Sequence, residues 1–566
     1  MSTLSTYAEP STADVVVIGA GINGLAITRE AARRGLRVVM IDRDDIAART
    51  SAISTRLIHG GLKYLERFEV PLVLESIRER DVLLRSAPHL VRPYPMLIPF
   101  SRGASRPGWM LSCGLMLHDI LAFRKKLPWN RIVFSKQLQR NWPAVAEGGV
   151  KWGGVFQDAH VPVTERFAME LAIDSARHGA QILTHTPVVT MLHNGSGIAG
   201  VVYRDRETGD ERELRARVVV NSAGPWVDEV LELDGAHDRR IGPTKGSHLI
   251  VDAFSGAPRT CIFFESPDDQ RPMFVLPWHD GKYMIGTTDL PYDESIDEIV
   301  INDDEIAYLL RAVNRLLPSA GLTADDVLWS YSGVRPLPYV ADLSDPSSVT
   351  RDSDIVEHTG TARGLMSVIG GKYTTHRALG EEALRHIETA LGMSHRRSGT
   401  RTAMFPGAPP AGVREFRQQF AATSVLTDRS ALRLASVYGT FAWRIEAIAE
   451  QHAELREVVD EESGAIAAEL VYAVREEGAV TLEDVLLRRT TIALGSDVAL
   501  ACAPRAVEIL VAHAGWSREY ASEELARYRS AVRRFAPRAL AGDASGTEPR
   551  RSRRTETGTH VEQGER

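Results

Sequence analysis

The sequence predicts an α/β fold in three parts: a Rossmann-type dinucleotide-binding domain, an inserted antiparallel-sheet domain and a C-terminal α-helical cap domain. A glycine-rich turn joins a strand to a helix near the N-terminus. Segments with hairpin character follow, and helical patterns dominate after about residue 400. The chain has 566 residues, more than a single hydrophobic core normally organises, so several domains are expected.

The first predicted element is a βαβ unit that carries a glycine fingerprint. Residues 14–18 (DVVVI) are an apolar β-branched run, a helical pattern extends to about Arg34, and residues 37–42 (RVVMID) form the next strand. The turn after the first strand reads GxGxxG, and an acid ends the second strand at the expected distance. Gly19 is assigned to the tight turn, Gly21 to the close approach of a pyrophosphate, Gly24 to helix packing and Asp42 to ribose binding.

Three later segments are predicted to be strands of the same sheet: residues 181–189 (QILTHTPVV), 216–224 (ARVVVNSAG) and 364–371 (GLMSVIGG). The last two end in glycine, as buried parallel strands that lead into helices often do. The chain has no second complete GxGxxG for a nicotinamide nucleotide, which favours a single deeply held flavin. Ala223 and Gly224 are expected to let the backbone approach it. Gly370 and Gly371 precede a predicted helix, whose positive N-terminal dipole would face the isoalloxazine.

The middle of the chain predicts a second, antiparallel sheet. Its segments are residues 247–254, 273–278, 283–288 and 331–340, with a turn at 279–282 between the second and third. After residue 400 come five helical patterns, from VREFRQQFAATS to PRAVEILVAHAG. Beyond Ala541 the chain lacks apolar anchors and is predicted to be disordered.

Composition excludes several classes of protein. A net charge of -7 argues against general nucleic-acid binding, which needs a basic face. The three cysteines are far apart and form no CxxC pair, so neither a disulfide framework nor a thiolate metal site is indicated, and a reducing cytoplasm fits. The first ten residues lack the features of a secretory signal, and no apolar run reaches the ~18 residues of a spanning helix.

Residues 109–123 (WMLSCGLMLHDILAF) predict an amphipathic helix with two interpretations. It is either a helix buried in the core or a helix that dips into a membrane surface. The pattern does not separate the two. The basic residues that would anchor the second arrangement are Arg102, Arg106, Arg124, Lys125 and Lys126.

The motifs together resemble the FAD-dependent sn-glycerol-3-phosphate dehydrogenases of the membrane-associated, quinone-linked aerobic type. The resemblance runs from about residue 12 to 535, through VIGAGINGLAIT, TSAISTRLIHGGLKYLE, ERDVLLRSAPHL, PTKGSH, IGTTD, YSGVRPL, SVIGGKYTTHRAL and TLEDVLLRRT. It implies an FAD-binding domain over residues 12–80, 150–235 and 345–400. The substrate-binding domain then takes residues 81–149 and 236–344, the helical domain 401–540 and the tail 541–566.

The resemblance also implies an anion-binding active site. Catalytic roles are expected for His248 in KGSH and Arg335 in SGVRPL, with His59 as the rival histidine. Family members commonly carry arginine where this chain has Lys63, so a single point charge is expected there. The other expected substrate contacts are Tyr64, Arg351 and Lys372. Further FAD contacts are expected from Ser51, Ser54, His59, Gly60, Gly61 and Lys372.

The implied reaction is oxidation of sn-glycerol 3-phosphate to dihydroxyacetone phosphate. A hydride would leave C2 for flavin N5 while the C2 hydroxyl loses its proton, assisted by His248 and the positive potential of Arg335. The implied electron acceptor is a quinone. The expected location is cytoplasmic, peripheral on the inner face of the cell membrane, and a homodimer is left open.

Three alternatives remain at this stage. An oxidase would pass the same electrons to dioxygen and release hydrogen peroxide, although no extra insertion like that of the soluble oxidases is evident in the middle of the chain. An amino-acid oxidase shares the two-domain plan, and a flavin-containing scaffold would not turn over at all. The anion-binding cluster with its histidine argues against the last two.

Overall fold

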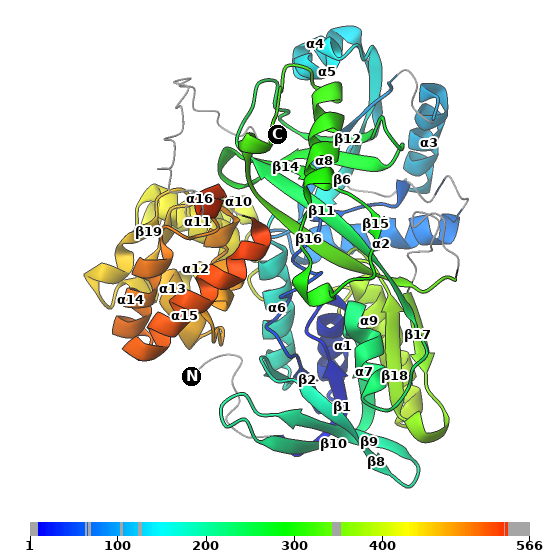
Figure 1. The fold of residues 1–566 in the computed structure, drawn as a ribbon, viewed down its shortest axis with the longest axis vertical. Coiled ribbons are helices and arrows are strands. Elements are labelled where there is room, and N and C mark those ends of the chain that lie inside the picture. The colour runs from blue at the N-terminus through cyan, green and yellow to red at the C-terminus, as the bar shows by residue number, and fades with distance from the viewer. Residues whose placement is uncertain are drawn as a thin grey trace.

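The computed structural model describes residues 10–62, 65, 69–101, 106–122, 127–341, 353–536 and 538–541. Two mixed sheets form the body of the molecule, and a unit of helices coloured yellow to red lies beside them (Figure 1). The α/β fold class with a C-terminal helical unit is therefore confirmed. The predicted disordered tail lies outside the described residues.

The first sheet is centred on β1 (Thr12–Ile18). This strand pairs in parallel with β10 (Glu211–Asn221) on one side and β2 (Val38–Ile41) on the other. Val15 and Val17 face a cluster that includes helix α1 (Ile22–Arg33). Val16 and Ile18 face the hairpin of β8 (Val188–Asn194) and β9 (Gly197–Arg204). The remaining strands are β18 (Leu365–Gly370), β17 (Ser353–Glu357), β7 (Gln181–Leu183), β8 (Val188–Asn194) and β9 (Gly197–Arg204).

Helices cover the face of this sheet toward which Val15 points. Helix α1 contacts both α6 and α9, so the three form one layer. Apolar side chains of α1 are buried there because a continuous β-branched strand needs cover on both faces. The bounds of these helices are α1 (Ile22–Arg33), α6 (Thr164–Arg177) and α9 (His376–Ala390).

One strand prediction needs correction. Residues 181–189 were expected to form a single strand, but the chain turns after Leu183 and β8 begins at Val188. His185 has a φ of 56°, in the left-handed region, which ends the strand. The β8 segment then pairs antiparallel with β9, at the periphery of the sheet.

The second sheet is built around the long antiparallel pair of β11 (Ile241–Val251) and β16 (Val327–Pro338). Strands β14 (Tyr283–Gly286) and β13 (Pro272–Pro277) continue it through the predicted hairpin. The other strands are β3 (Leu57–Ile58), β4 (Arg92–Pro99), β5 (Arg131–Phe134), β6 (Trp152–His160), β12 (Cys261–Glu265) and β15 (Leu290–Pro291).

The predicted domain ranges assigned β3 and β6 to the cofactor domain, but both hydrogen-bond into this second sheet. Strand β4 also pairs in parallel with β12, so the sheet is not purely antiparallel. The division of the chain into domains otherwise stays a prediction. The helices packed with this part of the chain are α2 (Val70–Ser86), α4 (Ser135–Asn141), α5 (Pro143–Glu147) and α8 (Asp303–Leu316).

The predicted amphipathic helix is α3 (Gly108–Leu121). Several of its large apolar side chains face solvent, and two of its polar side chains are buried. Trp109, Met116 and Ile120 are 65%, 67% and 65% exposed, whereas His118 and Asp119 are buried. The interpretation as a core helix is therefore wrong. Helix α3 lies on the far side of the body from the helical unit in this view (Figure 1). No described helix is long and apolar enough to span a bilayer.

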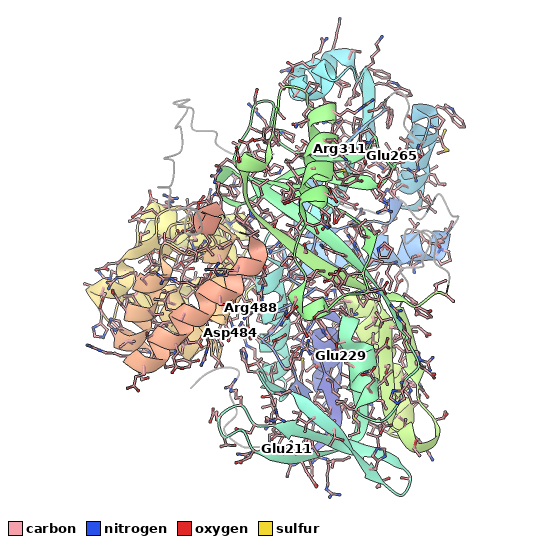
Figure 2. The ribbon with its side chains drawn as sticks, in the orientation of Figure 1. Glu211, Glu229, Glu265, Arg311, Asp484 and Arg488 are labelled. Atoms are coloured by element: carbon pink, nitrogen blue, oxygen red, sulfur yellow. The ribbon has the colours of Figure 1, made fainter. Side chains whose placement is uncertain are left out.

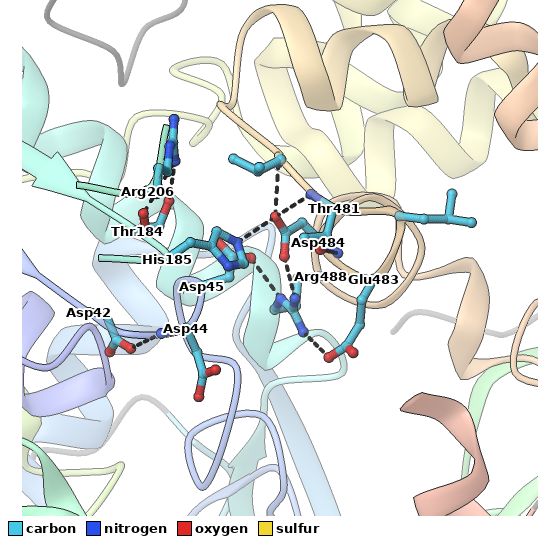
Figure 3. A network of polar contacts seen from close by, with 12 residues as sticks. Asp42, Asp44, Asp45, Thr184, His185, Arg206, Thr481, Glu483, Asp484 and Arg488 are labelled. Carbon is cyan, nitrogen blue, oxygen red and sulfur yellow. Dashed lines mark hydrogen bonds and ion pairs between the residues drawn. The ribbon is translucent and has the colours of Figure 1, made fainter. Parts of the chain in front are cut away.

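The C-terminal unit follows the predicted helical patterns. Its TLEDVLLRRT segment, however, forms a π-helix over Asp484–Arg489 rather than a regular α-helix. The π turn places Arg488 on the side that faces the cofactor sheet (Figures 2 and 3). Arg489 pairs with Asp45, which follows β2 of that sheet. The regular helices are α10 (Val413–Thr423), α11 (Asp428–Tyr438), α12 (Ala442–Ala449), α13 (Ala467–Arg475), α14 (Ala503–His513), α15 (Arg518–Ala531) and α16 (Arg538–Ala541).

A buried ion network attaches this unit to the cofactor sheet. Asp45 accepts Arg489 Nη1 and Nη2 at 2.6 and 2.8 Å and Arg488 Nε at 2.7 Å. His185 Nε2 lies 2.9 Å from Asp484 (Figure 3). Burial opposes the charged form of His185, but the hydrogen bond and the negative charge of Asp484 outweigh it and raise its pKa. Because arginine N–H groups already occupy both carboxylates, this cluster is an ion network rather than a vacant ligand set for a metal.

We expect Asp45→Asn to lower the free energy of unfolding by about 3–5 kcal/mol, because it leaves the buried Arg489 guanidinium without its carboxylate and removes one of the three carboxylates that pair with Arg488. Urea unfolding followed by circular dichroism measures this loss. The control is Glu523→Gln, which removes an exposed partner of Arg527 and should leave the midpoint unchanged. Equal midpoints for Asp45→Asn and the wild type would show that the network does not hold the units together.

Candidate active site

A cavity of about 470 Å³ lies where the carboxyl ends of β1, β10 and β18 meet the second sheet. Ligands of open α/β sheets bind in this position, because the strand ends and helix N-termini converge there. Strands β11 and β16 close its other side. The predicted site residues that line it are Gly19, Gly21, Asp42, Ser51, Ser54, Ala223, Gly224, His248, Arg335, Gly370, Gly371 and Lys372.

The glycine fingerprint has the geometry of a dinucleotide cradle. Gly19 has a φ of 106°, and a Cβ there would lie 2.5 Å from the Ser222 carbonyl oxygen. A Cβ at Gly24 would lie 1.9 Å from the Gly19 carbonyl oxygen, so helix α1 can approach the turn only without a side chain at this position. Gly21 is the N-cap residue of α1, beside Ser51, whose Oγ accepts the Ile22 N–H at 2.8 Å.

Asp42 is positioned for a ribose. Its carboxylate accepts the Ala20 N–H at 2.5 Å and the Asp44 N–H at 2.7 Å. Burial raises the pKa of Asp42 to about 6, and donation from ribose hydroxyls would favour its charged form. The residue thus fits the role that the fingerprint predicts for it.

Two polar atoms of the cavity wall support a polar occupant. Asn23 Oδ1 and Ser222 Oγ are buried and have no hydrogen-bond partner among the described residues. Buried polar atoms are normally satisfied, so each suits a ligand donor or acceptor. The Asn23 amide also donates to the Gly370 carbonyl at 3.3 Å, which ties α1 to the end of β18. The sequence motifs gave no signal for Asn23 beyond its place inside GxGxxG.

His248 enters the cavity from β11. Its ring stacks on Tyr331 with centroids 4.7 Å apart, and a Cβ at Gly286 would lie 2.2 Å from its Cδ2. Nε2 lies 3.0 Å from Thr55 Oγ1, while Nδ1 has no partner among the residues that the structure describes. Burial, followed by the positive charges of Arg335 and Arg56, lowers its pKa to about 3. The imidazole is therefore neutral at physiological pH and able to accept a proton.

Arg335 and Lys372 are two of the cationic side chains that line the same cavity. Arg335 donates from Nη1 to Asp289 at 2.9 Å and from Nη2 to Thr287 Oγ1 at 3.1 Å and the Thr288 carbonyl at 3.2 Å. Its guanidinium lies directly over Gly246, where a Cβ would be 2.3 Å from Nη2. Lys372 is buried at the end of β18. Two cations and a neutral histidine in one cavity suit an anionic substrate with an ionisable hydroxyl.

Arg56, which the motif analysis missed, holds the segment between the fingerprint and β3. It donates to both oxygens of Glu165 on α6 at 2.5 and 2.7 Å and to the Pro162 carbonyl at 2.9 Å. Its guanidinium also lies 4.7 Å from the Trp278 ring of the second sheet. The segment it fixes carries Thr55, the partner of His248. A single sequence offers no signal that this arginine is buried.

Several predicted contacts lie elsewhere or outside the described residues. His59, Gly60 and Gly61 do not line the cavity; the Gly60 N–H donates to Asp158 at 2.7 Å instead. Their assignment as FAD contacts stays a prediction. Lys63, Tyr64 and Arg351 lie outside the described residues.

Comparisons with known proteins agree with this geometry. A family described as FAD dependent oxidoreductase matches residues 14–377, and one described as the C-terminal domain of alpha-glycerophosphate oxidase matches residues 398–521. A glycerol-3-phosphate dehydrogenase of Synechocystis sp. is 39% identical over 532 residues, which are 91% of this chain and 95% of that protein.

Two further relatives extend the comparison. A D-erythritol 1-phosphate dehydrogenase of Brucella abortus is 38% identical over 493 residues, covering 85% of this chain and 95% of its own. The solved structure of the glycerol-3-phosphate dehydrogenase from Bacillus halodurans complexed with FAD has a TM-score of 0.75 at 26% identity. It covers 93% of this chain and 95% of that one.

Proposed function

Because the chain belongs to the family of FAD-dependent glycerol-3-phosphate dehydrogenases, we propose that it oxidises sn-glycerol 3-phosphate to dihydroxyacetone phosphate and passes the electrons to a quinone. One observation carries the proposal: a neutral, buried histidine and two cations share a cavity with the dinucleotide fingerprint. The comparisons with known proteins confirm the sequence resemblance to this family and FAD as the cofactor.

FAD would be held by the glycine turn, Asp42 and the ends of β10 and β18, and when bound it supplies the acceptor for the hydride from substrate C2. His248 accepts the proton of the C2 hydroxyl at Nδ1. For this, Nε2 must carry the imidazole hydrogen and donate it to Thr55 Oγ1, 3.0 Å away. The Thr55 hydroxyl can accept this hydrogen, which leaves Nδ1 as the acceptor.

Arg335 and Lys372 bind the phosphate in this proposal. The guanidinium also favours the alkoxide character that develops at C2, because positive potential stabilises negative charge in a site screened from water. Its ties to residues 287–289 fix it before substrate arrives, so little ordering remains to be done on binding.

The test is the visible spectrum of the purified protein, recorded anaerobically before and after addition of sn-glycerol 3-phosphate. Bleaching of the flavin band supports the proposal. D-erythritol 1-phosphate is the first comparison substrate, since a relative of 38% identity carries that name. Faster bleaching by the four-carbon phosphate would reassign the substrate, and an intact band with both would refute the proposed reaction.

A second experiment identifies the electron acceptor. The reduced protein is mixed with oxygenated buffer or, anaerobically, with a short-chain ubiquinone, and the return of the flavin band is timed. Reoxidation by the quinone faster than by dioxygen supports a dehydrogenase. The reverse order, with stoichiometric hydrogen peroxide, would identify the oxidase alternative.

We expect Arg335→Ala to retain FAD but to lower kcat/KM for flavin reduction by at least about a hundredfold, because it removes two charge-assisted hydrogen bonds to phosphate. Stopped-flow reduction of the flavin measures the loss. Arg311→Ala, which removes an exposed arginine on α8, is the matched control and should leave the rate unchanged. Wild-type kinetics in Arg335→Ala would remove this residue from the phosphate site.

The pH dependence tests His248. Its lowered pKa keeps the neutral form present as the pH falls, so the limiting rate of flavin reduction should hold down to about pH 5.5. A histidine of ordinary pKa, about 6.5, would by then have lost about nine-tenths of its neutral form. Limiting rates at saturating substrate remove the titration of the free substrate phosphate from the profile. A tenfold fall centred near pH 6.5 would contradict a buried neutral base, and His248→Asn should lower the rate at every pH by about a hundredfold or more.

The exposed face of α3 suits the proposed contact with a lipid surface, where the quinone resides. Trp109, Met116 and Ile120 present large apolar side chains to solvent. Trp129, just before β5, and Phe134, at the end of β5, are also exposed. A helix that exposes tryptophan and aliphatic side chains is typical of proteins that lie in a membrane interface. The basic residues 124–126 that follow α3 lie outside the described residues.

Replacing Trp109, Met116 and Ile120 together by glutamine is expected to abolish flotation with quinone-containing phospholipid vesicles while leaving anaerobic flavin reduction by substrate unchanged. The reason is that only the apolar face is lost, and this face does not line the active-site cavity. Trp443→Gln, at an exposed apolar site on α12 of the helical unit, is the control. Undiminished flotation of the triple variant would place the membrane contact elsewhere.

A further inference from the structure

A buried carboxylate lies behind the active-site cavity. Glu305 is the third residue of α8, and its Oε2 accepts the Asn302 N–H at 3.2 Å in a capping box. Glutamates in this role usually sit at the surface of a helix N-terminus and need only that one partner. Glu305 is only 3% exposed and does not line the cavity, so its charge must be satisfied by other protein groups.

Three side chains from two segments supply those partners. Ser247 Oγ and Thr288 Oγ1 donate to Oε1 at 2.7 and 2.8 Å, and Lys245 Nζ lies 2.6 Å from Oε2. Lys245 and Ser247 flank Gly246 on β11, directly before His248. Thr288 follows β14, in the segment that receives Arg335. One carboxylate therefore joins α8, β11 and the turn after β14.

Thr288 connects this carboxylate to Arg335. Its hydroxyl donates to Glu305 and accepts the Ser247 N–H at 2.9 Å, so the hydroxyl is held by two hydrogen bonds. Its carbonyl accepts Arg335 Nη2 at 3.2 Å. The guanidinium also lies over Gly246 of β11. Arg335 is therefore held between β11 and the turn after β14, the two segments that Glu305 joins.

We propose that Glu305 is a positioning residue for Arg335, acting through the Thr288 hydroxyl. This inference rests on the proposed function, in which Arg335 binds the substrate phosphate. Loss of the Thr288 hydroxyl frees the turn to shift relative to β11, and the guanidinium then loses its fixed orientation toward the anion. A merely structural role for Glu305 would lower stability and leave the affinity for phosphate as it is.

The experiment uses the holoenzyme of Thr288→Val, which keeps the shape of the side chain and removes the hydroxyl, and of Thr288→Ser, which restores it. We expect Thr288→Val to raise KM for sn-glycerol 3-phosphate about tenfold with a smaller change in kcat, and Thr288→Ser to return to near the wild-type KM. Glu305→Ala, which removes the acceptor of the Thr288 hydroxyl, should reproduce the KM effect of Thr288→Val. An unchanged KM in Thr288→Val overturns the proposal.

Two controls separate positioning from general stability. Glu469→Gln alters a glutamate of the same kind, buried at the third position of α13, ion-paired with Arg433 and remote from the cavity. It should lower the unfolding midpoint without raising KM. In an Arg335→Ala background, Thr288→Val should cause no further rise in KM, because Thr288 affects substrate binding only by orienting the Arg335 guanidinium. A full additional rise there would overturn the proposed route.

Inorganic phosphate provides a readout that does not need turnover. Its dissociation constant, measured from perturbation of the flavin spectrum, should rise about tenfold in Thr288→Val relative to the wild type. An unchanged constant overturns the proposal. If sn-glycerol 3-phosphate fails to reduce the wild-type flavin, the proposed function fails, whereas the phosphate titration still tests the positioning of Arg335.

Discussion

The arrangement of the site depends on the buried ion pair between Arg56 and Glu165. It fixes the segment that runs from the glycine fingerprint into the second sheet, and the same guanidinium lies against Trp278 of that sheet. Burial alone would lower the pKa of Arg56, but the adjacent Glu165 carboxylate more than offsets this and keeps the pKa raised. With bidentate geometry and a further carbonyl acceptor, the pair meets the condition under which a buried charge is tolerated.

The electrostatics of the cavity follow from this packing. His248 is neutral because it is buried between Tyr331 and Gly286, with two arginines near it. Arg335 keeps its orientation because Asp289, Thr287 and Thr288 surround it. A proton acceptor and a fixed cation thus coexist within one cavity. Both come from the second sheet, while the fingerprint comes from the first, so the relation between the two sheets governs the chemistry.

Local sequence signals predicted the elements of the fold well and their partners less well. The strand at 14–18, the GxGxxG turn and the hairpin at 279–282 are local features, set by β-branched runs and glycine positions, and they occur as expected. The break at His185 and the transfer of β6 to the second sheet were not predicted, and the exposure of α3 was one of two alternatives that the sequence left open. Each depends on which distant segment packs against the element. Helix α3 shows this most clearly, since the same pattern suits a core helix and an interfacial one.

The sequence by itself therefore determined the α/β class, the dinucleotide cradle, the family and the identity of His248, Arg335 and Lys372 as candidate residues. These features depend on short-range sterics and on motif spacing, which involve residues close together in the chain, so they could be predicted from the sequence. Only the tertiary structure decided that Thr55 faces His248, that Arg56 is buried, and that Glu305 reaches Arg335 through Thr288. These contacts join residues far apart in the chain, and hydrogen bonds of about 3 Å depend on packing that no local pattern encodes.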